Sequence, residues 1–77
     1  MKSKKSTKKL ICHKYPNGTK KWYLNNKLHR EDGPAVEYTN GDKVWYLNGK
    51  LYSEPDFYRQ LHKLGKITKE ELFIKLL

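Results

Sequence analysis

Lysines alternate with tryptophans and tyrosines over two short stretches of the chain, and this pattern has the clearest chemical meaning. Trp22 and Tyr23 occur in the first stretch, and Trp45 and Tyr46 occur in the second. Surfaces that bind single-stranded nucleic acid combine positive charge for the phosphates with aromatic rings on which the bases stack. The sequence therefore predicts a nucleic-acid surface on which these four rings stack against bases or contact another partner.

The candidate phosphate-binding residues are basic side chains along these stretches and in an N-terminal tail. The net charge is +9, of which residues 1–9 contribute five lysines and no acid, while residues 10–54 and 55–77 contribute +2 each. We expect the tail to be disordered, either as a solubilising terminus or as an arm that contacts phosphates. Lysines on edge strands also deter aggregation, which is a structural explanation for the others. The candidates are Lys2, Lys4, Lys5, Lys8, Lys9, Lys14, Lys20, Lys21, Lys27, Arg30, Lys43 and Lys50.

The cysteine and the histidines do not form a metal-binding pattern. Cys12 and His13 are adjacent, whereas metal ligands are separated in sequence and converge on one point. His29 and His62 are isolated, and we expect them on the surface of a hairpin and of a helix. Because Cys12 is the only cysteine, an intramolecular disulfide is excluded.

Glu31 and Asp32 form a carboxylate pair in sequence only. Neighbouring side chains on an extended chain point apart, so the two make a poor acid/base pair. We expect Asp32 to bond to its own backbone in the Asp-Gly-Pro turn. The sequence also has no phosphate-binding glycine loop, nucleophile elbow or cofactor fingerprint. We therefore predict a protein that is not an enzyme and uses no cofactor or metal.

A 23-residue repeat organises the chain. Tyr15–Glu31 reappears as Tyr38–Glu54, with identical residues at 11 of 17 positions. A period of this length indicates a small supersecondary unit that needs a neighbour to bury its apolar face. Asn-Gly signals at turn positions predict β-hairpins.

The expected fold is α+β, an antiparallel β-meander of two hairpin repeats followed by two short C-terminal helices. We expect one domain in which a meander (10–54) joins a helical cap (55–77). Ser53 or Glu54 should cap the first helix, with Pro55 in its first turn and Gly65 at its end. Thr68 and Glu71 match a capping box that begins the second helix. The expected strands span 10–15, 19–24, 27–30, 35–39, 43–47 and 50–53.

Both faces of the meander are partly apolar. Trp22 and Leu24 share one face and Tyr23 lies on the other, an arrangement that the second repeat copies. Because two short helices can hardly cover both faces, either the sheet curls on itself or one face meets another molecule. We expect the helices to cover one face and close its end, and at least one of Trp22 and Trp45 to be largely buried.

Membrane insertion and export are not expected. No apolar run approaches the roughly 20 residues that span a bilayer, and the lysine-rich start lacks the apolar stretch of a signal peptide. A chain of 77 residues has a marginal core, so dimerisation or a bound partner would add stability. We expect a cytoplasmic protein.

The stretch Trp22–Ala35 closely resembles a repeat written W-Y-x-N-G-K-x-H-R-x-D-G-P-A, which is similar to MORN-type hairpin repeats and typical of large bacteriophages and giant viruses. The match covers roughly residues 15–54. In the second copy Tyr52–Pro55 replaces the His-Arg-x-Asp-Gly-Pro segment, which indicates that the array ends in a capping helix. The resemblance implies a β-meander and a viral origin, and it implies no activity.

These observations lead to two functional hypotheses. The first is a small phage accessory protein in the host cytoplasm that binds RNA or single-stranded nucleic acid, a host protein, or both, and inhibits a host defence toxin or nuclease. The second is a protein-interaction module or scaffold whose charge only steers it towards an acidic partner. Self-association is compatible with either hypothesis.

Overall fold

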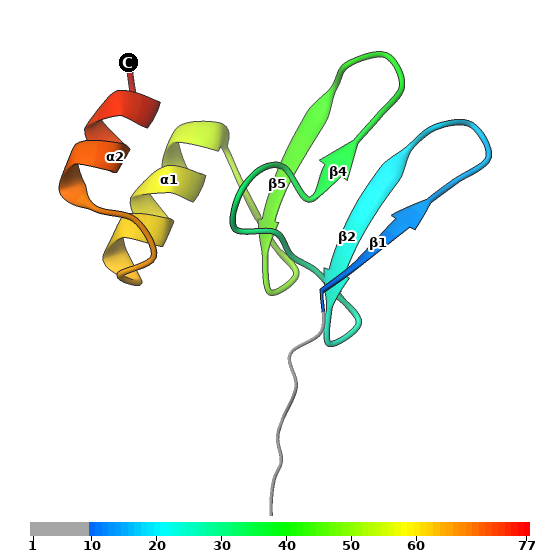
Figure 1. Ribbon diagram of the computed structural model, residues 1–77, viewed down its shortest axis with the longest axis horizontal. Helices are drawn as coiled ribbons and strands as arrows, with labels where there is room; N and C mark the ends of the chain where they lie inside the picture. The colour runs from blue at the N-terminus through cyan, green and yellow to red at the C-terminus, as the bar shows by residue number, and fades with distance from the viewer. Residues whose placement is uncertain (1–9) are drawn as a thin grey trace, which may run out of the picture.

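The computed structural model describes residues 10–77, which form an antiparallel meander followed by two helices (Figure 1). The predicted α+β fold is thereby confirmed, whereas the predicted basic tail at 1–9 lies outside the described residues. The strands are β1 (Leu10–Lys14), β2 (Lys20–Leu24), β3 (Lys27–Leu28), β4 (Val36–Glu37), β5 (Lys43–Leu47) and β6 (Lys50–Tyr52). The helices are α1 (Glu54–Lys63) and α2 (Lys69–Lys75).

The 23-residue period is visible as one turn built twice. Each turn begins at a tyrosine whose N–H donates to the carbonyl four residues later, at 2.9 Å. Asn17 and Asn40 accept, through Oδ1, the backbone N–H two residues after them at 2.9 Å. Gly18 and Gly41 follow at φ 95° and 96°, a left-handed conformation that favours glycine. The two turns lie side by side (Figure 1), where a Cβ on Gly18 would meet Thr39 Cγ2 at 2.8 Å.

Two-residue loops close the second hairpin of each repeat. Asn25 and Asn26 have φ values of 52° and 65°, and Asn48 and Gly49 have values of 52° and 80°. Two successive positive φ values are what a type I′ turn requires, and asparagine and glycine adopt them readily. The local sequence therefore sets the register of both hairpins.

β2 and β4 connect the two repeats into one sheet. β1 pairs with the full length of β2, whereas β3 and β4 each pair with part of β2, and β4 also pairs with β5. β3 and β4 have two residues each, shorter than the expected 27–30 and 35–39. The chain between them leaves the sheet at the Asp32-Gly33-Pro34 turn, where Pro34 has no N–H to donate to a partner strand.

The core lies at the junction of the sheet and α1. The molecule measures 43 × 36 × 16 Å, so the meander is a single layer. Leu47 of β5 packs with Phe57 and Leu61 of α1 in a buried cluster. Figure 1 shows α1 beside β5. The hairpin formed by β1 and β2, called the first hairpin below, lies at the far side of the sheet. The helices close the end of the meander as expected, but they do not cover a whole face of it.

The two tryptophans occupy equivalent positions and are both only partly buried. The largest fully buried side chains are Phe57 and Leu61 instead. Trp45 packs against the core with its ring centroid 6.4 Å from that of Phe57. The core is therefore centred on α1 rather than on the tryptophans, because a single-layer sheet cannot enclose its own aromatic residues.

Both helices begin and end as the sequence predicts. The Ser53 side chain accepts the N–H of Asp56 at the start of α1, and Gly65 has a φ of 75° after its end. Thr68 and Glu71 form the expected capping box at α2. The Thr68 N–H donates to the Glu71 carboxylate at 2.9 Å, and this bond lowers the pKa of Glu71.

His29 joins the two repeats from a buried position, so the expectation that it lies on a hairpin surface is wrong. It is 6% exposed, and its Nδ1 accepts the backbone N–H of Asn48 at 2.9 Å. With Nδ1 as acceptor, Nε2 carries the proton and donates to Glu31 Oε2 at 3.2 Å. The Gly49 N–H donates to the Leu28 carbonyl beside it at 2.8 Å.

Removing the His29 ring should destabilise the junction between the repeats. His29→Ala leaves the Asn48 N–H without its acceptor, and the free energy of unfolding should fall by about 1–3 kcal/mol. His29→Asn keeps an acceptor near the position of Nδ1 and should retain more stability. Urea denaturation followed by tryptophan fluorescence measures both variants. Equal losses in the two variants would show that the hydrogen bond to Asn48 is not the important contact.

Candidate nucleic-acid interface

Strand alternation divides the sheet into two different faces. The helix face carries Trp22 and Trp45, and α1 packs against it at β5 and β6. The open face carries Tyr23 and Tyr46. The four predicted rings are thus divided between the faces as the sequence indicates, and Trp45 already packs against α1. The tyrosines are the better candidates for contact with a partner.

A cluster on the open face of the first hairpin, the tyrosine cluster, consists of His13, Tyr15, Lys21 and Tyr23. The pairing of β1 with β2 places His13 opposite Lys21. The His13 and Tyr15 ring centroids are 4.8 Å apart, and Lys21 Nζ lies 5.2 Å from the Tyr15 centroid. The hydroxyl groups of Tyr15 and Tyr23 are 3.4 Å apart. Rings, a lysine charge and hydroxyl groups therefore meet in one place.

The hydroxyl pair shifts the titration of Tyr23 further above neutral pH. The hydrogen bond with Tyr15 is the main cause that raises the pKa of Tyr23 above 10.0, and burial acts in the same direction. Near neutral pH Tyr23 is thus an uncharged phenol that can donate or accept a hydrogen bond. It adds no negative charge beside Lys21, so the cluster stays favourable for a phosphate.

Two hollows border the tyrosine cluster. One has a volume of 520 Å³ and is lined by Tyr15, Lys21 and Tyr38 together with residues of the first turn. The other has a volume of 290 Å³ and is lined by Ile11, His13, Tyr23 and Asn26. Each hollow has an aromatic ring in its wall, and a flat base could stack there.

The two repeats carry different side chains at a cross-strand pair on the open face. His13 and Lys21 correspond, 23 residues later, to Val36 and Val44, which also lie opposite each other. Val36 is 2% exposed. The first repeat therefore carries a basic and polar pair where the second carries an apolar pair.

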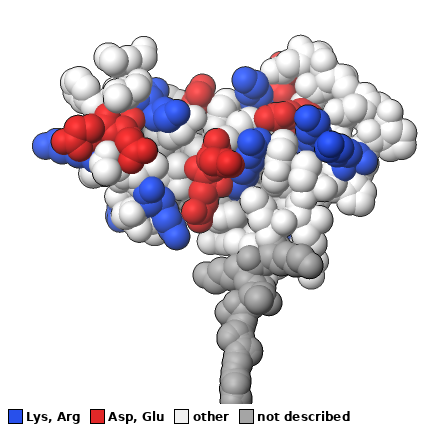
Figure 2. All heavy atoms as spheres, viewed as in Figure 1, with Lys and Arg blue, Asp and Glu red and all other residues white. Residues whose placement is uncertain are grey.

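The remaining basic candidates are spread over the sheet. Among the candidate lysines of the strands, Lys21 is the one whose side chain lies on the open face. Lys20 is its neighbour along β2 and therefore points to the opposite face. The other strand lysines pair with residues of the helix face and share that face. Figure 2 shows acidic side chains between the basic ones on the face in view. The candidates on the helix face are Lys14, Lys20, Lys27, Lys43 and Lys50. Lys2, Lys4, Lys5, Lys8 and Lys9 lie outside the described residues.

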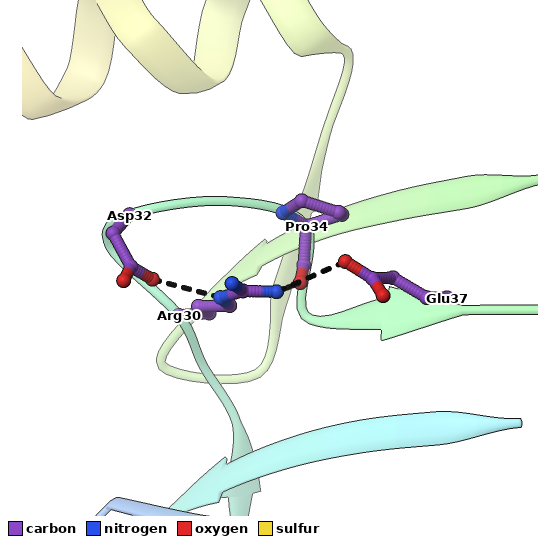
Figure 3. Close-up of polar contacts among 4 residues, drawn as sticks. All are labelled: Arg30, Asp32, Pro34 and Glu37. Carbon is purple, nitrogen blue, oxygen red and sulfur yellow. Dashed lines mark hydrogen bonds and ion pairs between the residues drawn. The ribbon is translucent and has the colours of Figure 1, made fainter.

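Arg30 contacts other protein groups, although it was a candidate for contact with phosphate. Its Nε donates to Asp32 at 2.7 Å, and its Nη1 donates to the Pro34 carbonyl at 3.2 Å and to Glu37 at 3.1 Å (Figure 3). Its Cζ lies 3.9 Å from the centroid of the Trp22 ring. Asp32 thus accepts from the Arg30 side chain, which corrects the expectation that Asp32 bonds to its own backbone.

A cleft of 570 Å³ lies on the helix face, where the first hairpin approaches the end of α1. Leu10, Leu24, Leu47 and Leu64 supply its apolar lining. On its polar side, Glu31 Oε2 lies 3.2 Å from His29 Nε2 and 3.8 Å from Lys66 Nζ. The charged groups of the cleft therefore pair with each other, which leaves the tyrosine cluster as the stronger candidate site.

Within residues 10–77, no group of three or more His, Cys, Asp or Glu side chains could hold a metal ion. No helix in this part of the chain is long and apolar enough to cross a membrane.

Sequence reasoning missed His13 and Tyr15 as members of the site. The signal was present, since alternation along β1 places residues 11, 13 and 15 on one face. The sequence alone did not show that this face joins Lys21, because that depends on the register of β1 with β2, which places His13 opposite Lys21.

Comparison of the chain with protein-family models, curated proteins and solved structures finds no match. The resemblance to MORN-type viral repeats stays a prediction, and the geometry of the site carries the functional argument.

Arg30 should matter for stability more than for nucleic-acid binding. Arg30→Lys keeps the charge but loses the planar fork and the stacking on Trp22, so the free energy of unfolding should fall by about 1–3 kcal/mol. Arg59→Lys is a matched control, because Arg59 forms an exposed pair with Asp56 and should change stability by no more than a few tenths of a kcal/mol. Thermal unfolding measures both variants. If Arg30→Lys instead weakened RNA binding at unchanged stability, Arg30 would belong to the interface.

Proposed function

We propose that the protein is a non-enzymatic binding module that holds single-stranded RNA, or another single-stranded nucleic acid, on the open face of its first hairpin. The observation that carries this proposal is the tyrosine cluster, in which the Lys21 charge lies over the Tyr15 ring beside His13 and Tyr23. Among residues 10–77, the helices pack at the other end of the sheet and leave this face uncovered.

The physical basis is stacking combined with charge. Base–aromatic stacking contributes about 1–3 kcal/mol per base and tolerates any base, because every base has a π face. Lys21 lines the larger hollow and lies opposite His13, which lines the smaller one, so it can supply a charge for the phosphates. The lysines of residues 1–9 would add affinity without sequence preference, since phosphate contacts position the strand and base contacts specify it.

Charge and stacking can be separated by their salt dependence. Lys21→Val copies the second repeat and should lower the slope of log affinity against log salt by about 0.7 for one lost phosphate contact. Tyr23→Leu should lose about 1–3 kcal/mol of binding free energy with little change of slope. Fluorescence anisotropy with a labelled single-stranded RNA, at several salt concentrations, measures both quantities.

The second repeat offers the matched control. Tyr46 corresponds to Tyr23 but has Val44 rather than a lysine on the same strand face, so Tyr46→Leu should weaken binding less than Tyr23→Leu. Equal losses at the two positions would show that the tyrosine cluster is not the site. Absence of RNA binding at low salt would end the proposal.

A protein partner is the second candidate, favoured by one specific observation. Phe73 and Ile74 of α2 are 72% and 66% exposed, and Leu77 is 95% exposed. Contiguous exposed apolar side chains mark protein contact sites more often than nucleic-acid sites. With the viral origin that the resemblance implies, such a partner would be a host protein, and our hypothesis is a host defence toxin or nuclease that the chain inhibits.

Co-purification distinguishes the two candidates. The tagged protein is captured from lysate with and without nuclease, alongside the variants Phe73→Ser and Tyr23→Leu. RNA binding predicts a complex that nuclease removes, that Tyr23→Leu weakens and that Phe73→Ser leaves intact. A complex that survives nuclease and is lost in Phe73→Ser would favour the protein partner.

A further inference from the structure

We propose that β1 is a self-association edge at which two copies of this chain pair antiparallel, with Cys12 of one copy opposite Cys12 of the other. This pairing would extend the sheet across the two molecules. The inference goes beyond the proposed function and stands or falls independently of it.

The outer edge of β1 is free for pairing within the described part of the chain. β1 is the terminal strand of the sheet, and all five of its residues are exposed. The Trp22 N–H donates to the Ala35 carbonyl, and the Trp22 carbonyl accepts from the His29 N–H, so both groups of Trp22 point away from β1. Cys12 lies opposite Trp22, and its own N–H and carbonyl therefore point outward.

Alternation along β1 extends this argument to its two ends. Leu10 and Lys14 lie two residues from Cys12, so their N–H and carbonyl groups point to the same free edge. Ile11 and His13 direct their backbone groups to β2 instead. The edge therefore offers hydrogen bonds at three alternate residues.

β1 has few of the features that protect edge strands from pairing. Soluble proteins usually protect such edges with charged side chains, especially lysine, with proline or bulges, or by keeping the strand very short. β1 contains no proline or glycine, pairs with β2 in unbroken register over its whole length, and carries its lysine at its last position. Leu10 and Ile11 are 47% and 54% exposed. A regular and partly apolar edge of this kind fits another strand.

The register of the pairing follows from the outward residues. With a two-fold axis centred on Cys12, all three outward residues of each copy form hydrogen bonds with the other copy. Leu10 of each copy then lies opposite Lys14 of the other. No like charges then face each other, and the lysine stem can lie along the leucine side chain. An axis centred on Ile11 or His13 would leave one outward residue of each copy without a partner.

The way in which the two repeats pair within one chain indicates that a second copy of the chain binds at the β1 edge. Within one chain the two repeats already join edge to edge, with β4 between β2 and β5. β4 occupies in the second repeat the position that β1 occupies in the first, and its outer edge pairs with β2. The corresponding outer edge of β1 therefore has the geometry that accepts another strand of the same chain type. The two-fold axis also brings the tyrosine clusters of both copies onto one face, so a dimer would present a site of doubled length if that cluster binds nucleic acid.

Disulfide trapping tests the register. Residues that exchange both hydrogen bonds in an antiparallel pair have Cα atoms about 5.5 Å apart, within the range that a disulfide spans. Mild oxidation of the full-length protein, without nucleic acid, should give a dimer band that dithiothreitol removes. The matched control Cys12→Ser/Lys14→Cys carries its thiol on the same edge, but its two thiols would lie far apart in this register. Equal cross-linking of the two proteins would overturn the proposed register.

Charge substitution tests the pairing without a disulfide. Leu10→Glu faces Lys14 of the other copy and should strengthen the dimer, whereas Leu10→Lys should weaken it, with dissociation constants that differ roughly tenfold or more. Leu51→Glu and Leu51→Lys, at an exposed position of β6, control for net charge. Sedimentation under reducing conditions measures all four variants and the unmodified protein.

Salt should change the affinity of the dimer and the affinity for nucleic acid in opposite directions. Each copy has a net charge of +9, so rising salt should strengthen the dimer by screening repulsion, whereas it weakens nucleic-acid binding. A monomer at every salt and protein concentration would overturn the self-association proposal and leave RNA binding untouched. Species larger than a dimer would also overturn it, because a two-fold pairing closes.

Discussion

Hydrogen bonds between the repeats hold the meander together, because a sheet one layer thick encloses no core of its own. The segment 28–37 supplies several of them: His29 accepts from Asn48, the Gly49 N–H donates to the Leu28 carbonyl, and the Arg30 N–H donates to the Tyr46 carbonyl at 3.3 Å. The Arg30 guanidinium holds the segment itself in shape by bonding Asp32 and Glu37. Each such bond contributes only about 1 kcal/mol net, yet a small domain is stable by about 5–15 kcal/mol in total. The core around α1 secures the second repeat, and this segment connects the first repeat to it.

The two repeats share a backbone but not an environment. β4 lies between β2 and β5, so Val36 is buried and an apolar pair with Val44 suits its position. β1 is at the edge, so His13 on β1 is exposed and Lys21, opposite it on β2, is still partly exposed. The position of a repeat in the array thus decides which of its side chains are available for recognition.

Much of the fold could be predicted from periodicity and turn chemistry. The copied Tyr-x-Asn-Gly turns, the Asn-Asn and Asn-Gly loops, and the caps at Ser53 and Thr68 are local, and local signals are visible in the sequence. The burial of His29 and the partners of Arg30 could not be predicted, because the segment between β3 and β4 has no periodic pattern and His29 bonds to a residue 19 positions away. The tyrosine cluster was only partly visible, since it depends on cross-strand register as well as on alternation.

The strand order has a consequence for how the protein is made. Within residues 10–77, all strand pairs join neighbours in sequence except that of β2 with β4, which skips β3. Chains with such short-range contacts fold quickly, because little loop-closure entropy is lost before each pairing forms. The turns can therefore form early, but an isolated hairpin is only marginally stable in water. The buried cluster contains Phe57 and Leu61 of α1, so the sheet becomes stable only after this late part of the chain has been made.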